Sequence, residues 1–332
     1  MAISIGAQID VGYSKETTRG TAITSNPAYW LKANPTNIKD DPKYAFSRGA
    51  AGNIAGLSAA RLARNNAMGD IEGEIFTDPV GLEFLALCGD VDSVRRTGAG
   101  VTLYDHTFIL QLGSNEHQSL TVTYSDPVQQ YRIAETIINT WNFDFNVDSE
   151  DFIMRTMNVL ARAREKITPR ITPSAPQDTT NFVPTEAGFK MANTEAGLSA
   201  ASDLNVLEGG LEVNKNAVGR WRTGAANKTF ARAGNLRSTI TGSFKLDLEN
   251  LTQNDLVFNG TPQALEYSMS NGASGNDLRE IKFILPLVYF PTYEFDRDVD
   301  NPLGETINWE AAQAGGGTDF LKIILTNEIT AY

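Results

Sequence analysis

Residues 137–164, IINTWNFDFNVDSEDFIMRTMNVLARAR, decide the fold. In the first part of this stretch apolar side chains such as Trp141 and Phe143 alternate with polar ones, as in a strand with one buried face. The polar cluster 148–151 follows, and 153–164 again has apolar residues at every second position. The two runs therefore predict a long antiparallel hairpin.

Other short runs rich in β-branched and aromatic residues predict further strands around this hairpin. They cover residues 107–112, 119–124, 207–215, 239–249, 279–289 and 320–329. Residues 281–290 are apolar on both alternating faces, which indicates a strand covered on both sides. Pro286 lies inside that run and predicts a sheet edge or a bulge, because proline has no N–H to donate.

One helix is well marked, between Asp78 as N-cap with Pro79 in its first turn and Gly89 as a left-handed stop. So short a helix needs a sheet to lie against, and we expect Glu83 to point away from that sheet. Cys88 ends the helix and is expected to be a core residue, because no basic neighbour in the sequence would activate its thiol.

Three segments lack the periodicity of a strand or helix: 32–70, 168–205 and 312–318. The first is rich in Ala, Gly and Asn, the second contains several prolines, and the third is rich in Ala and Gly. Loops of this length are unusual in a compact domain. We expect them to be disordered or to be ordered by partners in an assembly.

Composition excludes several classes of protein. The chain has 332 residues, 41% of them hydrophobic, and a formal net charge of −12, which disfavours general nucleic-acid binding. A single cysteine forms no intramolecular disulfide, and two histidines do not supply a His-rich metal site. The N-terminus does not resemble a secretory signal and no apolar run is long enough to span a bilayer, so no membrane association is expected.

Sequence motifs for catalysis or cofactor binding are also missing, so we expect no enzyme, no cofactor and no metal site. The run from Asp296 resembles a calcium loop, but its sixth position is Asn301 and its twelfth Ile307, where such loops have Gly and Glu. His106 and His117 have no nearby metal-ligating partners in the sequence and are expected to be structural. The alternative from another class is a β-sandwich carbohydrate-binding module or glycosidase. Its sugar platform would use one of the four tryptophans, Trp30, Trp141, Trp221 or Trp309, although Trp141 fits a core position better.

The order of several short motifs resembles the tail tube (major tail) proteins of tailed bacteriophages. The opening is the most distinctive, because residues 16–22, ETTRGTA, match an E-T-x-x-G-T-A-like stretch after a short strand. The resemblance covers about half the chain and weakens after residue 165. The matching pieces are 6–12, 15–22, 73–75 with the helix after it, 104–108, 119–124 and the hairpin 137–164.

This resemblance implies a mainly β fold: an antiparallel β-sandwich or partial barrel with one flanking α-helix and long loops, which completes a ring β-barrel on oligomerisation. The chain is longer than the simplest members of the family, so its second half is an elaboration of one domain or part of a second. Because the opening motif does not recur, we expect one enlarged tube domain over 1–332, with a long loop at 32–70 and a Pro-rich insertion at about 168–205.

Proteins of this kind form stacked rings, usually hexameric, around a channel. If six subunits each contribute four strands, twenty-four strands spaced about 4.8 Å and tilted about 40° give a backbone diameter of roughly 48 Å. Side chains of about 5 Å on each wall leave a bore near 38 Å, against about 20 Å for duplex DNA. Double-stranded DNA would pass through without specific binding.

The net charge is consistent with that role, since an acidic wall repels phosphate over a Debye length of about 8 Å. Asp144, Asp148, Glu150 and Asp151 are the candidate carboxylates of the bore, and the alternative is that they form an ordinary solvated sheet face. We also expect a basic group to meet an acidic group between rings. The basic group is Arg48, Arg61 and Arg64, and the acidic group is Glu294, Asp296, Asp298, Asp300 and Glu305.

The expected partners follow from the resemblance. They are further copies of the chain, other phage tail proteins (tape measure, terminator, baseplate or tip, and a sheath in a contractile tail), and double-stranded DNA in transit. The expected location is the virion tail, after assembly in the host cytoplasm.

Overall fold

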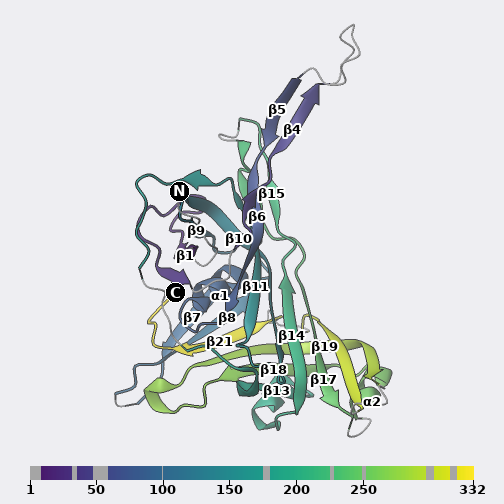
Figure 1. Cartoon of the computed structure of the whole chain (residues 1–332). Coiled ribbons are helices and arrows are strands. Elements are labelled where there is room, and N and C mark those ends of the chain that lie inside the picture. Colours follow the sequence, from purple (N-terminus) through teal and green to yellow (C-terminus); the bar gives the residue numbers. More distant parts are fainter. Residues whose placement is uncertain are drawn as a thin grey trace.

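A computed structural model describes residues 9–31, 36–47, 59–98, 100–174, 180–224, 228–248, 252–296, 303–314 and 320–332. The fold is mainly β, built of antiparallel strands with few helices (Figure 1). None of the helices in these ranges is long and apolar enough to cross a membrane.

The largest sheet, called the broad sheet below, crosses both halves of the chain. Its neighbouring strands pair antiparallel, and β10 joins the two halves by pairing with β11 on one side and β14 on the other. In spatial order its strands are β3 (Lys39–Asp40), β6 (Asn66–Glu74), β11 (Met154–Arg162), β10 (Gln130–Asn146), β14 (Val206–Asn214), β17 (Thr239–Asp247), β20 (Gly304–Ala311) and β19 (Glu280–Asp296).

Two smaller sheets extend from the broad sheet. The first small sheet comprises β2 (Tyr29–Leu31), β1 (Asp10–Lys15), β9 (Leu120–Ser125), the first half of β10 and β12 (Glu165–Lys166). The second small sheet comprises β13 (Ala187–Ala192), β18 (Gln263–Ser270), the first half of β19, β21 (Lys322–Asn327), β8 (Tyr104–Leu110) and β7 (Gly89–Arg95). No pairing among the described strands closes a barrel within one chain.

The strands β10 and β19 each belong to two sheets, so each must bend. Both contain 17 residues. The register of β10 against β9 shifts between Ile133 and Thr136, and the register of β19 against β18 shifts across Pro286. A bulge of this kind bends a strand and increases its twist. The bulge predicted at Pro286 is therefore confirmed.

The main core lies where the broad sheet packs on the second small sheet. Trp141 and Phe143 on β10 face Phe283 on β19, with ring centroids 5.6 and 5.0 Å apart. Phe84 of helix α1 (Val80–Cys88) packs edge-on against Trp141 and Phe283. Each such fully buried aromatic side chain contributes about 1.5–3 kcal/mol by leaving water. The predicted hairpin, its inward alternation and the core position of Trp141 are confirmed.

Helix α1 is buried on every side rather than lying with one face in solvent. The prediction that Glu83 points away from the sheet is wrong. Its carboxylate is 1% exposed, pairs with Arg155 Nη2 at 2.7 Å and accepts a bond from Trp141 Nε1 at 2.9 Å. The positively charged Arg155 on β11 makes burial of the Glu83 carboxylate possible. The spacing of apolar residues in the sequence does not indicate such a partner.

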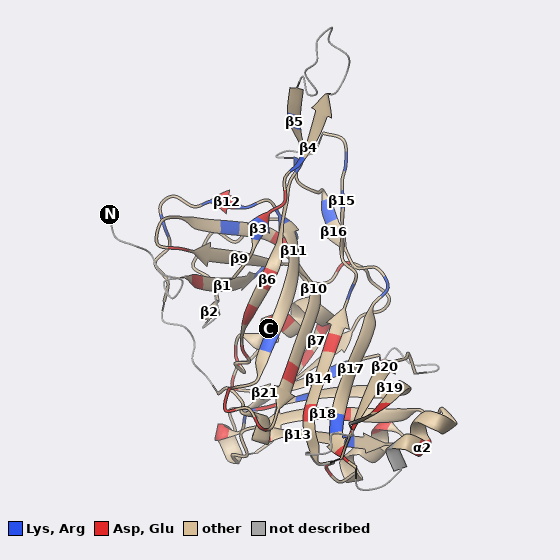
Figure 2. Ribbon diagram, turned by 45° about the vertical axis from the view of Figure 1, so that its right-hand side comes forward, with Lys and Arg blue, Asp and Glu red and all other residues tan. Residues whose placement is uncertain are grey.

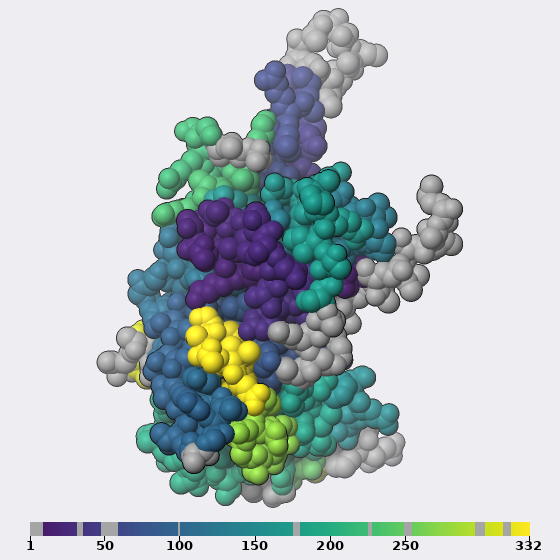
Figure 3. Space-filling view, turned by 90° about the vertical axis from the view of Figure 1, so that its left-hand side faces the viewer, coloured from purple at the N-terminus to yellow at the C-terminus, as the bar shows by residue number. Residues whose placement is uncertain are grey.

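The ends of α1 agree broadly with the sequence. Gly89 adopts the left-handed conformation expected of a stop, with φ of 90°, while Pro79, not Asp78, is the N-cap residue. Burial raises the pKa of the Cys88 thiol to about 12, as expected of a core cysteine. Tyr332 covers the start of the helix and donates to Asp78 O at 2.7 Å. Figure 3 shows the C-terminal segment, in yellow, beside the N-terminal segment, in purple.

The prediction of a long loop over 32–70 is wrong for the described parts of this segment, because they contain strands. Besides β3 and most of β6, it includes β4 (Lys43–Ser47) and β5 (Ala59–Arg64), which pair only with each other and project from the body as an arm (Figure 1). Nearly every side chain of the arm is exposed. Without a buried face the sequence shows no alternation, which explains why the prediction failed.

The Pro-rich segment 168–205 also contains ordered elements: the 3₁₀ helices η2 (Pro184–Glu186) and η3 (Glu195–Ala200), and between them β13. A second short helix, α2 (Thr252–Asn259), was not expected, because Thr, Gln, Asn and Asp dominate its first turn. A second hairpin, β15 (Val218–Arg220) with β16 (Arg232–Gly234), lies near the base of the arm (Figure 1). The segment 315–319 lies outside the described residues.

The buried ion pair gives a stability prediction. Arg155→Met should lower the free energy of unfolding by about 3–5 kcal/mol, because it leaves the Glu83 carboxylate buried without its partner. The double variant Arg155→Met with Glu83→Leu should recover most of that loss. Urea unfolding of the unassembled chain measures both, and equal destabilisation by single and double variants would contradict the pairing.

Candidate assembly surfaces

The ETTRGTA motif holds the bend of β10. Glu16 is 2% exposed, and its carboxylate accepts four hydrogen bonds, one from within the motif and three from distant parts of the chain. The donors are Gly20 N at 2.7 Å, Ser119 Oγ at 2.6 Å, Thr121 Oγ1 at 3.1 Å and Glu135 N at 2.8 Å. Hydrogen bonds to a charged acceptor are each worth about 1.5–3 kcal/mol, so this site is a strong local constraint.

The residue that receives this constraint is itself unusual. Glu135 lies in the bulge of β10 with φ of 48°, a conformation that non-glycine residues seldom adopt. Its buried carboxylate pairs with Arg19 Nε at 3.3 Å and Arg162 Nη2 at 2.6 Å. It also accepts a bond from Ala233 N at 3.0 Å. Arg19 of the motif, which also donates to Ala233 O, therefore connects β10 to β16 of the β15–β16 hairpin.

The exposed face of the broad sheet is acidic. Directly opposite residues of antiparallel strands share a face, and one row across this sheet reads Glu72, Thr156, Asn142, Glu212, Thr241 and Glu310. On the described strands Lys39 and Lys245 supply positive charge to the face, while Arg162 turns to Glu135. The carboxylates of the face among the described residues are Asp70, Glu72, Glu74, Asp144, Glu208, Glu212, Asp247, Glu294 and Glu310. Figure 2 colours the acidic positions along these strands red.

The predicted carboxylates lie on this face or at one end of it. Asp144 is exposed between Met154 and Gly210 on the neighbouring strands. Asp148, Glu150 and Asp151 are exposed in the turn that joins β10 to β11. Whether they face a bore stays a prediction.

The two ends of the broad sheet carry opposite charge. Strand directions place both hairpins, β4–β5 and β15–β16, at one end and the β10–β11 turn at the other (Figure 1). Among the described residues, five exposed arginines lie at the hairpin end: Arg61, Arg64, Arg220, Arg222 and Arg232. Arg64 stacks over the Trp221 ring at 5.3 Å and so links the arm to the second hairpin.

The expected meeting of basic and acidic groups needs one correction. Glu305 is 1% exposed and accepts a bond from Tyr293 Oη at 2.6 Å, so it is not available to an arginine of another ring. Burial raises the pKa of its carboxyl, and the Tyr293 hydroxyl opposes that rise. Arg48, Asp298 and Asp300 lie outside the described residues, and the side chain of Asp296 is not described. Arg61, Arg64 and Glu294 are exposed.

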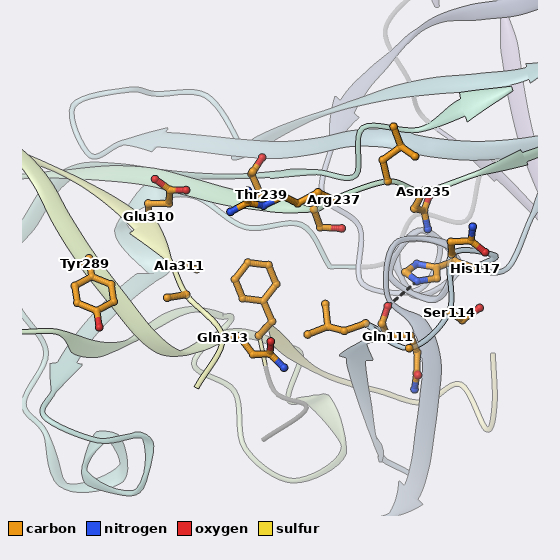
Figure 4. A pocket seen from close by; sticks show the side chains of 17 residues that line it. Gln111, Ser114, His117, Asn235, Arg237, Thr239, Tyr289, Glu310, Ala311 and Gln313 are labelled. Carbon is orange, nitrogen blue, oxygen red and sulfur yellow. Dashed lines mark hydrogen bonds between the residues drawn. The ribbon is translucent and has the colours of Figure 1, made fainter. Parts of the chain in front are cut away.

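A groove of about 830 Å³ opens beside the end of β20 (Figure 4). His117, Arg237, Tyr289 and Glu310 are among its lining residues. The two ring nitrogens of His117 lie 2.8 Å from Leu87 O and 3.0 Å from Gln111 O. Burial, with nearby Lys215, lowers the pKa of the ring to about 4, so the neutral ring donates to one of these carbonyls. His117 therefore holds the ends of two elements together, as expected of a structural histidine.

His106 is structural as well, since its ring bonds Ser93 Oγ and Asn327 Oδ1 at 2.8 and 3.1 Å. Among the described residues no group of three His, Cys, Asp or Glu side chains could hold a metal ion. The sugar-platform alternative fails for three of its tryptophans, because Trp30, Trp141 and Trp309 are each at most 1% exposed. Trp221 packs against Phe230 with ring centroids 6.1 Å apart.

Sheet, arms and charged ends together describe a structural subunit that presents its surfaces to other copies or partners. The family model for the phage tail tube protein matches residues 6–319, and the chain belongs to that family. It is a structural protein of the phage tail, and hence virion-associated.

A chain in the cryo-EM structure of the anti-feeding prophage (AFP) baseplate, 6-fold symmetrised, is similar at a TM-score of 0.31 and 11% identity. The match covers 52% of this chain and 99% of that one. No curated protein matches the sequence.

The motif site gives a second prediction. Glu16→Ala should lower the free energy of unfolding by about 2–4 kcal/mol, because four donors lose a charged acceptor and some of them stay buried. Glu72→Ala, on the exposed face, should change it by no more than about 0.5 kcal/mol. Thermal and urea unfolding of both variants test this, and matching values would show that the motif does not hold the bend.

Proposed function

We propose that this protein forms rings that stack into a tube and conduct double-stranded DNA, with the acidic face of the broad sheet lining the bore. The observation that carries the proposal is that face itself, which is polar, wide and acidic while most of its opposite side is buried. The resemblance implies six four-stranded contributions around each ring.

Layering favours the acidic face as the inner wall. Both small sheets and the helices pack on the other side of the broad sheet. In a closed ring the outer circumference is longer than the inner one, so the additional layers fit outside. Joining the broad sheet across copies would also remove its exposed edges, which otherwise promote aggregation.

Charge explains why DNA would pass without being held. A protein that neutralises several phosphates binds DNA tightly and with steep salt dependence, which would stop a conduit from releasing its cargo. On the described face nine carboxylates stand against two lysines, so phosphate contacts would be few. Transport would then depend on the width of the bore and on repulsion, and the protein would need no enzymatic activity, cofactor or metal.

Opposite charge at the two ends of the sheet would set the stacking direction. The basic hairpin end of one ring would meet the acidic turns of the next, since complementary potentials fix register and polarity. Besides further copies, the proposed partners are other tail proteins at the ends of the tube and, during assembly in the host cytoplasm, the tape measure. Negative-stain electron microscopy of the concentrated protein should show rings or tubes. A protein that stays monomeric at high concentration would contradict the proposal.

Reversing the charge of the face should make the tube retain DNA. The variant Asp144→Lys/Glu212→Lys/Glu310→Lys should still form tubes, and short duplex DNA should then co-sediment with them at about 50 mM salt and be released at higher salt. The matched control is Asp92→Lys/Asp277→Lys/Glu328→Lys, whose exposed positions lie off the broad sheet. Equal DNA retention by the two variants would place the acidic face outside the bore.

Reversing the charge of the arm should weaken stacking. Arg61→Glu/Arg64→Glu should raise the protein concentration needed for tube growth about tenfold, which corresponds to about 1.4 kcal/mol per contact. The control Arg95→Glu/Lys190→Glu makes the same charge change away from the arms. Sedimentation across a dilution series measures the threshold, and an unchanged threshold for the arm variant would exclude electrostatic docking by these arginines.

A further inference from the structure

The two halves of the chain repeat the same strand pairings. In the first half β1, β9, the beginning of β10 and β12 lie side by side, as do β3, β6, β11 and the end of β10. In the second half β13, β18, the beginning of β19 and β21 lie side by side, as do β14, β17, β20 and the end of β19. Each of these pairs has an antiparallel counterpart in the other half, while β2, β7 and β8 of the first half have none among the described strands.

The connections repeat as well. A two-stranded hairpin follows β3 in the first half and β14 in the second, β4–β5 and β15–β16 respectively. A short helix follows the next strand in each half, α1 after β6 and α2 after β17. Figure 1 shows both hairpins directed toward the same end of the molecule.

Register agrees residue by residue. Thr140 of β10 lies opposite Asn158 of β11, and Thr292 of β19 lies opposite Asn308 of β20. From these pairs the register continues without a shift in both hairpins. The last pairs are Asp144 opposite Met154 and Asp296 opposite Gly304. The same two residue types therefore meet at the same position of two separate hairpins.

A sequence repeat accompanies this register. Residues 140–149, TWNFDFNVDS, and 292–301, TYEFDRDVDN, are identical at five of ten positions. Residues 155–161, RTMNVLA, and 305–311, ETINWEA, are identical at three of seven. Gly69 and Gly242 also correspond through their strand partners, and at each a Cβ would overlap a neighbouring backbone.

We infer that the chain is an internal duplication of one tube unit, and that each ring closes from three copies rather than six. This rests on the proposed ring-forming function. It replaces the expectation of one enlarged domain over 1–332 with two units, each contributing four strands to the broad sheet, and it replaces six chains per ring with three.

The width of the bore decides between the two counts. Three chains with eight strands each give twenty-four strands and a backbone diameter of about 48 Å. Six chains would give forty-eight strands and about 96 Å, several times the roughly 20 Å of a duplex. Three chains therefore reproduce the bore of a ring with six four-stranded units.

The junction between the halves shows how neighbouring chains would meet. Within one chain the end of β10 pairs with β14, and Asn142 lies opposite Glu212. The corresponding strands are β19 and β3, so β19 of one copy would pair with β3 of the next. By the same register Glu294 would lie opposite Lys39, giving an ion pair across the interface. Both side chains are exposed in the single chain. This head-to-tail contact closes a ring when the rotation per copy completes the circle.

A disulfide ladder counts the copies. Directly opposite residues of antiparallel strands have Cα atoms about 4.5–5.5 Å apart, which suits a disulfide. Lys39→Cys/Glu294→Cys should cross-link each copy to the next when assembled tubes are oxidised. The native Cys88 is buried and does not interfere. Non-reducing gels should then show species of one, two and three chains of 36.1 kDa each, and none larger.

Each outcome of this experiment is decisive. A ladder that continues to six chains would overturn the three-copy ring and leave the proposed tube function standing. Tubes without any cross-link would overturn the β19–β3 junction and with it the inference. Absence of rings and tubes in the unaltered protein would instead overturn the proposed function. Lys39→Cys alone is the control and should give no ladder.

Charge exchange provides an independent readout that does not depend on oxidation. Glu294→Lys should raise the concentration needed for assembly, because it places two lysines opposite each other, and Lys39→Glu combined with it should restore the original value. Glu212→Lys is the matched control, since its strand pairing lies within one chain. Failure of the double variant to recover, with all variants folded by circular dichroism, would contradict the predicted register.

Discussion

The bend of β10 at Glu135 is the constraint on which the rest of the structure depends. This strand connects the first small sheet to the broad sheet, so the angle between them is set where its backbone takes a positive φ. Such a conformation costs about 1–3 kcal/mol in a non-glycine residue and persists only where its surroundings enforce it. The Glu16 carboxylate holds the amide of Glu135, and two arginines hold its side chain.

The second long strand solves the same problem with different chemistry. In β19 the register shift falls at Pro286, whose missing N–H makes an unpaired ladder position costless. Buried charge also differs between corresponding positions, since Arg155 pairs with Glu83 whereas Glu305 is held by Tyr293. The fold therefore requires a bend and tolerates a polar group at these positions, but it does not prescribe the residues that provide them.

These particulars explain what the sequence could predict. Alternation around Trp141 identified the hairpin because one face is buried along its whole length, and Gly89 marked a helix end through its backbone conformation. The environment of Glu83 depends on Arg155, 72 residues away, and no local pattern reports that contact. The arm was missed because exposed strands leave no periodic trace. The repeat was missed because its identities cluster near two turns, while the opening motif occurs once.

Duplication within one chain changes the physics of assembly if three copies close a ring. Half of the junctions between four-stranded units are then intramolecular, like that of β10 with β14, and form at the high effective concentration of a folded chain. Only the other half of the junctions form between separate subunits, so less translational and rotational entropy is lost per ring. Fusion also lets the units diverge: one carries the long β4–β5 arm and the other the short β15–β16 hairpin, so a ring would present long and short contacts alternately to its neighbour. Such alternation would restrict stacking to rotations of one third of a turn, whereas six identical units would allow rotations of one sixth.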